Sequence, residues 1–437
     1  MRRVLVLSPN TWDLDELAKP KYRGHYEPVY FETGFYETPL LLAGLTFDIR
    51  DSIARAIAAG RAARVDGVIG THDYPASLEA AAVAAGLGLP GPPVDRALVC
   101  HHKYLCRQVQ ERAAPEATPA FGLIDPFDFQ PWSLPLAFPF FVKPVKGTLS
   151  VRAGRADDYA ALRGILSLSF LERSVGRLVM RPFNQMLADY TNFGTNGNAF
   201  IAEGVLDGTC QVTVEGFVDE GRVGIMGIVD SVMYPGTISF ERFEYPTRLP
   251  CGVQARMRAL AVRTVEATGF WHGCFNVEMM YDADADSIGI IEMNPRLCGQ
   301  FSDLYEKVDG TSGYDVQLAL ATGRRPVFRA ADGPCRVAAS FVLRVFEDRR
   351  VVRLPDARGL DEIRRRFPGV VVKLLCREGQ WLSQQPQDMT SYRYAIVNLG
   401  GDSFEELDLA SVELRRHLRV EFESPASRRN LRPSFRA

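Results

Sequence analysis

Two glutamates, Glu278 and Glu292, are the residues of this chain best suited to bind a metal ion. They lie in the apolar stretches FNVEMM and IIEMN, which have strand character and are joined by the short acidic turn ADADS. An antiparallel hairpin with this turn would place the two carboxylates side by side on one face. Because adjacent carboxylates repel each other and lose hydration in an apolar hairpin, a cation or a proton must offset them. The spacing therefore predicts a divalent-metal site.

Asn294 and Arg296 follow Glu292 at intervals of two residues and extend this candidate site. Asn294 falls on the same strand face, so it completes with Glu278 and Glu292 the all-oxygen ligand set that Mg²⁺ prefers. Arg296 adds a permanent positive fork that suits a phosphate or a carboxylate. A buried ion pair between Glu278 and Arg296 would explain the same residues without a ligand, and this alternative stays open.

Lys143 and Lys146 flank a proline in VKPVKGT, at the end of a predicted strand. The small residues GTLS of the following turn would expose backbone amides, so the turn predicts a contact to phosphate. A solvated strand end explains the two lysines equally well, since lysine is mostly a surface residue. Lys103 is a single lysine on a predicted helix, and His101 and His102 before it are expected at the surface.

Other sequence motifs that are typical of metal or nucleotide sites are incomplete or missing from the sequence. The aspartates of DADADS have the spacing of a calcium loop, but Ser287 stands at its sixth position and Met293 at its twelfth, so a solvated turn is expected. The histidines lack the spacing of a zinc site. The sequence has no GxSxG, no Walker GxxxxGK[ST] and no GxGxxG motif.

The elements that must position these residues alternate between strand and helix over the first hundred residues. RVLVLS and VDGVIGTHD predict strands, whereas DSIARAIAAGRAARV and ASLEAAAVAAGLG predict helices. This order favours a parallel sheet covered by helices, which we place at residues 1–95. Thr71, His72 and Asp73 end a strand where such sheets bind ligands, although capping of the turn and the helix after it is the favoured interpretation.

The remainder of the chain predicts a middle domain at residues 96–325 and a C-terminal unit at 326–437. The middle domain combines the strand FPFFVKP, an antiparallel meander, the amphipathic helix ARMRALAVRTVEATG, the glutamate hairpin and the helix GYDVQLALATG. The C-terminal strands RVAASFVLRVF and RYAIVNLGG, with two helices, form a small α+β unit. The expected fold class is therefore α/β and α+β.

Composition limits the class of partner. The chain has 437 residues, of which 46% are hydrophobic and 24% charged, with a net charge of -2. This profile is typical of a soluble globular protein, and the absence of a basic excess argues against nucleic acid as the main partner. The start, MRRVLVLSPN, has too short an apolar run for a signal peptide or a membrane span. Eight dispersed cysteines indicate reduced thiols and a cytoplasmic protein.

The order of these pieces resembles the ATP-grasp superfamily. The resemblance covers roughly residues 95 to 323 and is carried by Lys103, the stretch FVKPVKGTLS, the hinge strand FIAEGVLDG and the acidic stretches FNVEMM and IIEMNPR. EMNPR after a paired VE strand is the most specific piece. The resemblance implies a preceding α/β domain, an ATP-grasp domain and a small C-terminal unit.

Carried over residue by residue, the resemblance implies contacts to ATP. Lys103 and Lys143 would contact its phosphates, and Lys143 would also serve catalysis. The backbone of Glu203 and Leu206 would hold the adenine edge. Gln211 stands where relatives carry a ribose-binding acid, which is a departure from the family pattern.

The resemblance also assigns roles to the acidic stretches. Glu278, Glu292 and Asn294 would bind Mg²⁺, as two ions that bridge the phosphates. Arg296 would act in catalysis by steadying the transferred phosphoryl group or the acyl intermediate.

The activity that the resemblance implies is that of a carboxylate-amine ligase. A carboxylate attacks the γ-phosphate of ATP, an amine then attacks the acyl phosphate, and ADP and phosphate are released. The C-terminal stretch is similar to the unit that closes amino-acid and dipeptide ligases. The substrates would be a small carboxylate and an amine, with Glu241, Arg242 and Arg296 as candidate contacts, and a homodimer stays open. A biotin-carboxylase-like enzyme that activates bicarbonate and a non-catalytic nucleotide-binding module remain alternatives.

Overall fold

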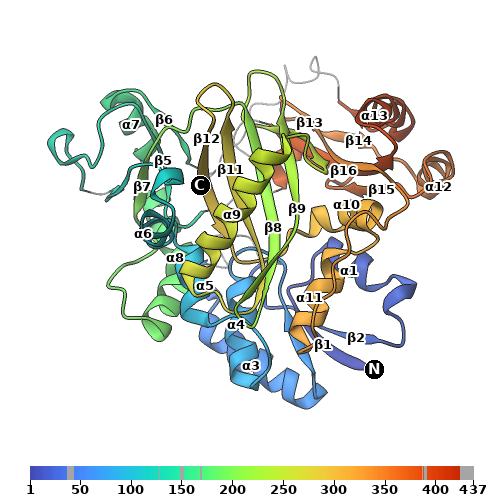
Figure 1. Ribbon diagram of the computed structural model, residues 1–437, viewed down its shortest axis with the longest axis horizontal. Helices are drawn as coiled ribbons and strands as arrows, with labels where there is room; N and C mark the ends of the chain where they lie inside the picture. Colours follow the sequence, from blue (N-terminus) through green and yellow to red (C-terminus); the bar gives the residue numbers. More distant parts are fainter. Residues whose placement is uncertain are drawn as a thin grey trace.

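The computed structural model describes residues 1–36, 44–126, 128–147, 152–167, 170–385, 387 and 391–423. Within these residues the strands form four sheets, of which an eight-stranded sheet is the largest (Figure 1). The predicted phosphate turn GTLS lies mainly outside the described residues. The mixed α/β architecture confirms the predicted fold class.

The N-terminal sheet is parallel, as the alternation of strands and helices predicts. Its order is β2-β1-β3, with β1 at Arg2–Leu7, β2 at Tyr26–Phe31 and β3 at Gly67–Ile69. The run VLVL in β1 is apolar throughout because both faces of the strand are buried. Leu5 and Leu7 pack toward α3 (Ile49–Ala63) and α4 (Ala76–Leu87).

A small antiparallel sheet follows, with the order β4-β7-β5-β6. It includes β5 at Phe140–Pro144 and β7 at Phe200–Gly204, which carry Lys143 and Glu203. Its other members are β4 at Phe121–Ile124 and β6 at Gly154–Ala156, and α7 (Tyr159–Leu166) packs on it.

The large sheet is antiparallel throughout and has the order β12-β11-β8-β9-β10-β13-β16-β15. Helix α9 (Cys251–Thr268) crosses one face of it, in front of the strands in Figure 1. The strands are β12 (Ser287–Asn294), β11 (Gly273–Asp282), β8 (Cys210–Asp219), β9 (Arg222–Met233), β10 (Phe240–Tyr245), β13 (Val337–Val345), β16 (Tyr392–Gly401) and β15 (Val371–Leu374).

The last three of these strands lie on the C-terminal side of the predicted domain boundary at residue 326. They continue the same sheet as the glutamate hairpin rather than a separate one, because β13 pairs with β10. The domain limits at 95 and 325 stay predictions.

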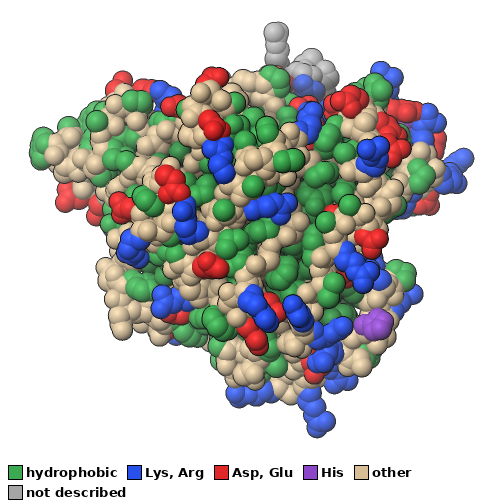
Figure 2. Space-filling model, viewed as in Figure 1, with side chains coloured by type: hydrophobic (Ala, Val, Ile, Leu, Met, Phe, Trp, Pro, Cys, Tyr) green, Lys and Arg blue, Asp and Glu red, His purple; other side chains and the backbone are tan. Residues whose placement is uncertain are grey.

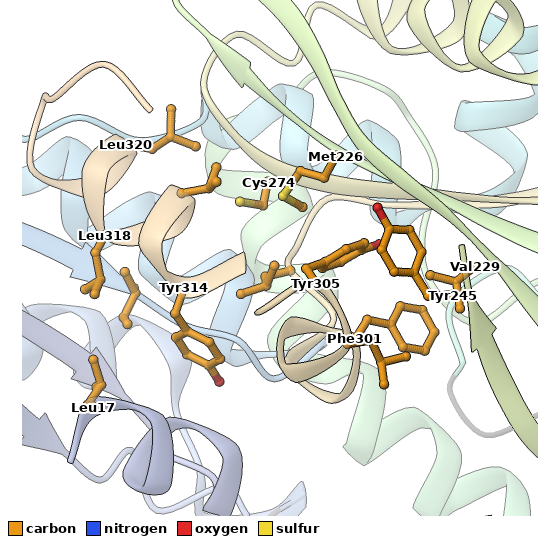
Figure 3. Close-up of a cluster of buried hydrophobic side chains, with 14 of the residues drawn as sticks. Leu17, Met226, Val229, Tyr245, Cys274, Phe301, Tyr305, Tyr314, Leu318 and Leu320 are labelled. Atoms are coloured by element: carbon orange, nitrogen blue, oxygen red, sulfur yellow. The ribbon is translucent and has the colours of Figure 1, made fainter. Parts of the chain in front are cut away.

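One hydrophobic core joins the N-terminal sheet to the large sheet (Figure 3). Its link is a pair of helices that follow the hairpin, α10 (Gly299–Asp309) and α11 (Gly313–Ala321). From α10, Phe301 and Tyr305 contact the aromatic residues Phe243 and Tyr245 of β10. From α11, Leu318 and its neighbours pack in the same cluster as Val4 and Val6 of β1. This shared core fixes the N-terminal sheet against the hairpin.

The remaining elements pack around these sheets and helices. Residues of α8 (Phe170–Tyr190) pack in the core of the N-terminal domain. The others are α1 (Thr11–Leu17), α5 (Val94–His101), α6 (Lys103–Ala113), α12 (Ala357–Arg366), α13 (Phe404–Leu418), the paired strands β14 (Val351–Arg353) and β17 (Glu421–Phe422), and the 3-10 turns at Pro20–Tyr22, Pro115–Ala117, Pro131–Ser133 and Leu382–Gln384.

The surface charges, the helices and the cysteines can be compared with the predictions made from composition. Positive and negative side chains are interspersed over most of the face in Figure 2. Among the helices in the described part of the chain, none has the length and apolarity required to cross a membrane. All eight cysteines are free thiols.

Candidate active site

The glutamate hairpin has the register that the sequence predicts. Glu278 lies directly opposite Glu292, and Asn276 lies opposite Asn294. Val277, between them in β11, points to the other face and into the core beneath α9. The amide Nδ2 of Asn294 donates to Asn276 Oδ1 at 3.1 Å and lies 3.4 Å from Glu292 Oε1. Two carboxylates and two amides therefore share one face at the end of the hairpin.

The two carboxylates are buried, and their protonation differs because their neighbours differ. Burial and the repulsion of Glu292 raise the pKa of Glu278 to about 7. Burial also acts on Glu292, but Lys103 and Lys143 outweigh it and lower the pKa of that carboxyl. Lys103 Nζ lies 3.4 Å from Glu292 Oε2. At neutral pH Glu292 is therefore ionised, whereas Glu278 beside it is held partly protonated.

Lys143 reaches this face from the small sheet and is anchored by a buried acid. Its Nζ lies 2.8 Å from Glu203 Oε2 and donates to the carbonyl of Ile291 at 3.3 Å. Arg107 of α6 binds the same two groups, with Nε 2.7 Å from Glu203 Oε1 and Nη2 2.7 Å from the Ile291 carbonyl. Burial would raise the pKa of Glu203, but Arg107 and Lys143 hold it at about 2.

Arg107 is a member of the site that the sequence did not reveal, because it is one of several charges on a polar helix. The side chain of Glu203 is engaged in these ion pairs, and the residue lies in the sheet between Phe121 and Phe141. Its predicted backbone contact to adenine stays a prediction.

The segment between β7 and β8 crosses close to the hairpin. A Cβ on Gly289 of β12 would lie 2.4 Å from Leu206 Cδ2, so this approach requires glycine. Gln211, at the start of β8, donates from Nε2 to Glu278 Oε2 at 3.3 Å. The structure therefore brings Leu206 and Gln211 to the hairpin that carries the glutamate pair.

Arg296 lies beside the glutamates, but it does not form the ion pair with Glu278 that the sequence left open. Within the described residues, the carboxylate at ion-pair distance is Asp73, whose Oδ1 lies 3.8 Å from Arg296 Nε. The same Nε is buried and has no hydrogen-bond partner among these residues. The Arg296 guanidinium thus lies near an acid of the N-terminal domain, and its Nε donor has no hydrogen-bond partner among the described residues.

The favoured interpretation of Thr71, His72 and Asp73 as helix caps is wrong. Helix α4 has Pro75 at its N-cap and no side-chain cap. The Thr71 hydroxyl donates to a buried acid of α1, Asp13, at 2.6 Å. The ring of His72 stacks on a neighbouring tyrosine. Of the three, Asp73 alone is in ion-pair contact with Arg296.

The expected surface positions of His101 and His102 are also wrong. His101 is 4% exposed and His102 is 0% exposed, because α5 and α6 meet here beneath the N-terminal domain. Lys146, which could have been a solvated strand end, is 5% exposed, and its Nζ binds both carboxylate oxygens of Asp73 at 3.2 and 3.3 Å.

Glu241 and Arg242 are not brought to the glutamate pair. Arg242 binds Glu241, Glu244 and Asp408 of α13, on the face of β10 opposite to the one that contacts α10. Their predicted contact with substrate has no support from this geometry.

Glu215 is a further acid of the site that the sequence did not single out. It lies opposite Asn276 in β8, is 0% exposed, and accepts a hydrogen bond from the Cys298 amide at 2.6 Å. Its second oxygen, Oε2, has no hydrogen-bond partner among the described residues. Burial outweighs these contacts and raises the pKa of Glu215 to about 8.

This raised pKa predicts a pH-dependent stability that Glu215→Gln removes. The buried carboxyl keeps its proton in the folded protein and releases it near pH 4.5 in the unfolded chain. The folded state therefore loses stability as the pH rises from about 4.5 to about 8, by roughly 5 kcal/mol on the linkage relation. Urea unfolding at pH 5.5 and 8.5 should show a smaller loss for Glu215→Gln than for the wild type. Equal losses in the two proteins would contradict the buried neutral carboxyl.

The hairpin offers few side-chain groups that could coordinate a metal ion. Within the described ranges, no group of three or more His, Cys, Asp and Glu side chains is placed to hold a metal ion. The hairpin offers two carboxylates and the amides of Asn276 and Asn294 on one face. Such an all-oxygen set suits Mg²⁺, which usually takes one or two protein carboxylates and completes its shell with phosphate and water.

Comparisons with known proteins identify the fold. No family model and no curated protein matches the sequence. Among solved structures, an L-amino acid ligase from Bacillus licheniformis is similar over 97% of this chain and 99% of its own, with a TM-score of 0.71 and 19% identity. A phosphoribosylglycinamide synthetase from Anaerococcus prevotii has a TM-score of 0.65 and 13% identity over 97% and 100% of the two chains. A biotin carboxylase from Campylobacter jejuni, in complex with a form of ATP, has a TM-score of 0.61 and 14% identity over 96% and 92%. The fold of this chain is therefore the fold that these enzymes share.

Proposed function

We propose that this chain, which has the ATP-grasp fold, is an ATP-dependent carboxylate-amine ligase that forms an amide bond through an acyl phosphate. The observation that carries the proposal is the buried pair Glu278 and Glu292, directly opposed on one hairpin, with Lys103 and Lys143 at their side. Two opposed buried carboxylates are costly unless a cation or a proton offsets them, and a bound metal ion would do so.

The residues on this face fit Mg²⁺. Glu278, Glu292 and Asn294 would hold the metal, as two ions, and the metal would neutralise charge on the triphosphate during transfer. Lys103 and Lys143 would contact the same phosphates as point charges. Leu206 and Gln211 border the expected position of the nucleoside.

The chemistry requires positive charge where the phosphoryl group moves. An oxygen of the substrate carboxylate attacks the γ-phosphorus, and ADP leaves. The amine then attacks the acyl carbon, and the phosphate leaves with the bridging oxygen. Arg296 would stabilise the negative charge that develops at these steps, since its guanidinium has a donor, Nε, that no described residue accepts. Enclosure by the small sheet would exclude water, which otherwise hydrolyses the acyl phosphate.

The likeness to an L-amino acid ligase favours an amino acid as one substrate. Biotin carboxylase is also among the similar structures, so bicarbonate activation is the second candidate. We place the reaction in the cytoplasm, with small molecules as substrates.

An isotope experiment tests the reaction class. Amino acids labelled with ¹⁸O in the carboxylate are incubated with ATP, Mg²⁺ and a panel of amines, and the released phosphate is analysed by mass spectrometry. We expect one ¹⁸O atom per phosphate, because the bridging oxygen of the acyl phosphate leaves with phosphorus. Release of unlabelled phosphate, or stimulation by bicarbonate without any amine, would exclude the ligase.

A further inference from the structure

We propose that Asp73 is a positioning residue for this reaction, through which the N-terminal domain orients Arg296 and Lys146 toward the reacting groups. The inference rests on the proposed function, because it assigns Asp73 to the site of the same reaction. It goes beyond that function, since the nucleotide and metal contacts proposed above do not involve the N-terminal domain.

The contacts of Asp73 show that it joins two cations. Asp73 follows β3 at its carboxyl end. Its carboxylate binds Lys146 Nζ through both oxygens, at 3.2 and 3.3 Å, and its Oδ1 lies 3.8 Å from Arg296 Nε. The two cations come from the small sheet and from the end of the glutamate hairpin, which are distant in the sequence. One carboxylate therefore ties three parts of the molecule together.

His101 contacts both Lys146 and Asp73, since its Nδ1 also lies 3.3 Å from Asp73 Oδ1. Lys146 Nζ lies 3.1 Å from His101 Nδ1, and His101 Nε2 lies 2.9 Å from Ser77 Oγ. Burial and Lys146 lower the pKa of His101 to about 4, so its ring is neutral at physiological pH. The Ser77 hydroxyl in turn donates to the backbone carbonyl of Asp73. The chain of bonds closes on Asp73 itself.

Asp73 holds the Arg296 guanidinium together with one hydrogen bond, which Nη1 donates to the carbonyl of Leu297 at 3.4 Å. A cavity of about 40 Å³ lies between the N-terminal domain and the hairpin, and its lining includes Pro295, Arg296 and Gly70. That volume can hold a water molecule. Asp73 supplies the nearby charge, and Lys146, His101 and Arg296 together outweigh its burial and keep its pKa well below the ordinary value. The carboxylate is therefore ionised over the working range of pH.

This arrangement predicts which kinetic constant Asp73 controls. The Asp73 carboxylate contacts Lys146 and Arg296, which lie at the proposed site. The residues proposed to bind the nucleotide lie on other elements. Loss of its charge should disturb the reacting geometry and leave ATP binding intact, because a displaced charge lowers the rate more than the affinity.

The test compares Asp73→Asn with the matched control Asp66→Asn. Asp66 lies at the amino end of β3, where its Oδ2 accepts the Arg3 amide at 2.8 Å. We expect Asp73→Asn to lower kcat about 10- to 100-fold, the usual effect of a group that orients catalytic ligands, with KM for ATP within about twofold of wild type. Asp66→Asn should retain wild-type kcat. Formate should restore activity to Asp73→Ala, since it replaces the missing carboxylate.

Two results would overturn the inference. A raised KM for the amine at unchanged kcat would mean that Asp73 binds the substrate ammonium directly. Equal kcat for Asp73→Asn and Asp66→Asn, with an active wild type, would remove Asp73 from the reaction and leave the proposed function standing.

A crystal structure of Asp73→Asn gives a readout that needs no turnover. The Arg296 guanidinium and Lys146 Nζ should move while Glu278 and Glu292 stay in place. Unmoved cations would overturn the inference, even if the wild type proved inactive and the proposed function had failed.

Discussion

Replacing Glu292 with glutamine is expected to lower Mg²⁺-dependent ATP turnover by about 10³-fold, since one lost electrostatic contact at the transferred phosphoryl group costs this much. The substitution keeps the shape of the side chain and removes one of two opposed carboxylates from the proposed metal site. Lys103 also loses the carboxylate that lies 3.4 Å from its Nζ and keeps its hydrogen bond to the carbonyl of Gly147. Release of ADP, measured against Mg²⁺ concentration, should show both a lower maximal rate and weaker activation by Mg²⁺.

Stability should change little in this variant. Glu292→Gln loses the ion pair with Lys103 but also relieves the repulsion that raises the pKa of Glu278. The two effects oppose each other, so the midpoint of thermal unfolding at pH 7 should stay close to that of the wild type. Asp284→Asn is the matched control, because it removes one acid from the exposed turn of the same hairpin. Wild-type turnover in Glu292→Gln would remove the residue from the mechanism.

The glutamate hairpin could be predicted from the sequence because its pairing depends on residues that are close together in the chain. Glu278 and Glu292 are joined by one short turn, so alternation and turn chemistry fix which residues face each other. The parallel N-terminal sheet could also be predicted, because strand and helix patterns alternate over the first hundred residues. In contrast, no helix was predicted between residues 154 and 198, where the structure has α7 and the long helix α8 with Pro182 in its interior.

The polar network around Asp73 could not be predicted because its partners are remote. Asp73 and Lys146 are separated by 73 residues, and Lys146 and His101 by 45. Each residue alone is an ordinary surface type, and a paired, buried role depends on how the domains meet. The continuation of the large sheet into β13 has the same origin, since the pairing of β10 with β13 joins strands on either side of the expected boundary.

Replacing Arg296 with glutamine is expected to reduce the rate of amide formation by about 10²- to 10³-fold, the loss typical for a group that stabilises developing charge. The affinity for ATP should stay close to wild type, because the proposed nucleotide contacts belong to Lys103, Lys143 and the segment beside Leu206. Acyl phosphate that forms without Arg296 to steady it should be lost to water. The ratio of ADP released to amide formed, measured in one reaction mixture, should therefore rise above the wild-type ratio.

Arg296→Lys tests whether a positive charge is sufficient at this position or whether the planar guanidinium is required. Lysine retains a positive charge but lacks the planar fork that can face Asp73 and an anionic intermediate together, so activity should recover only in part. Arg256→Gln is the control, since that exposed arginine pairs with Asp286 at the distant turn of the hairpin and should leave the coupling ratio unchanged. If Arg296→Gln weakened ATP binding and kept the coupling ratio, Arg296 would be a nucleotide ligand. Its Nε, which has no hydrogen-bond partner among the described residues, would then face a phosphate of bound ATP and not the acyl intermediate.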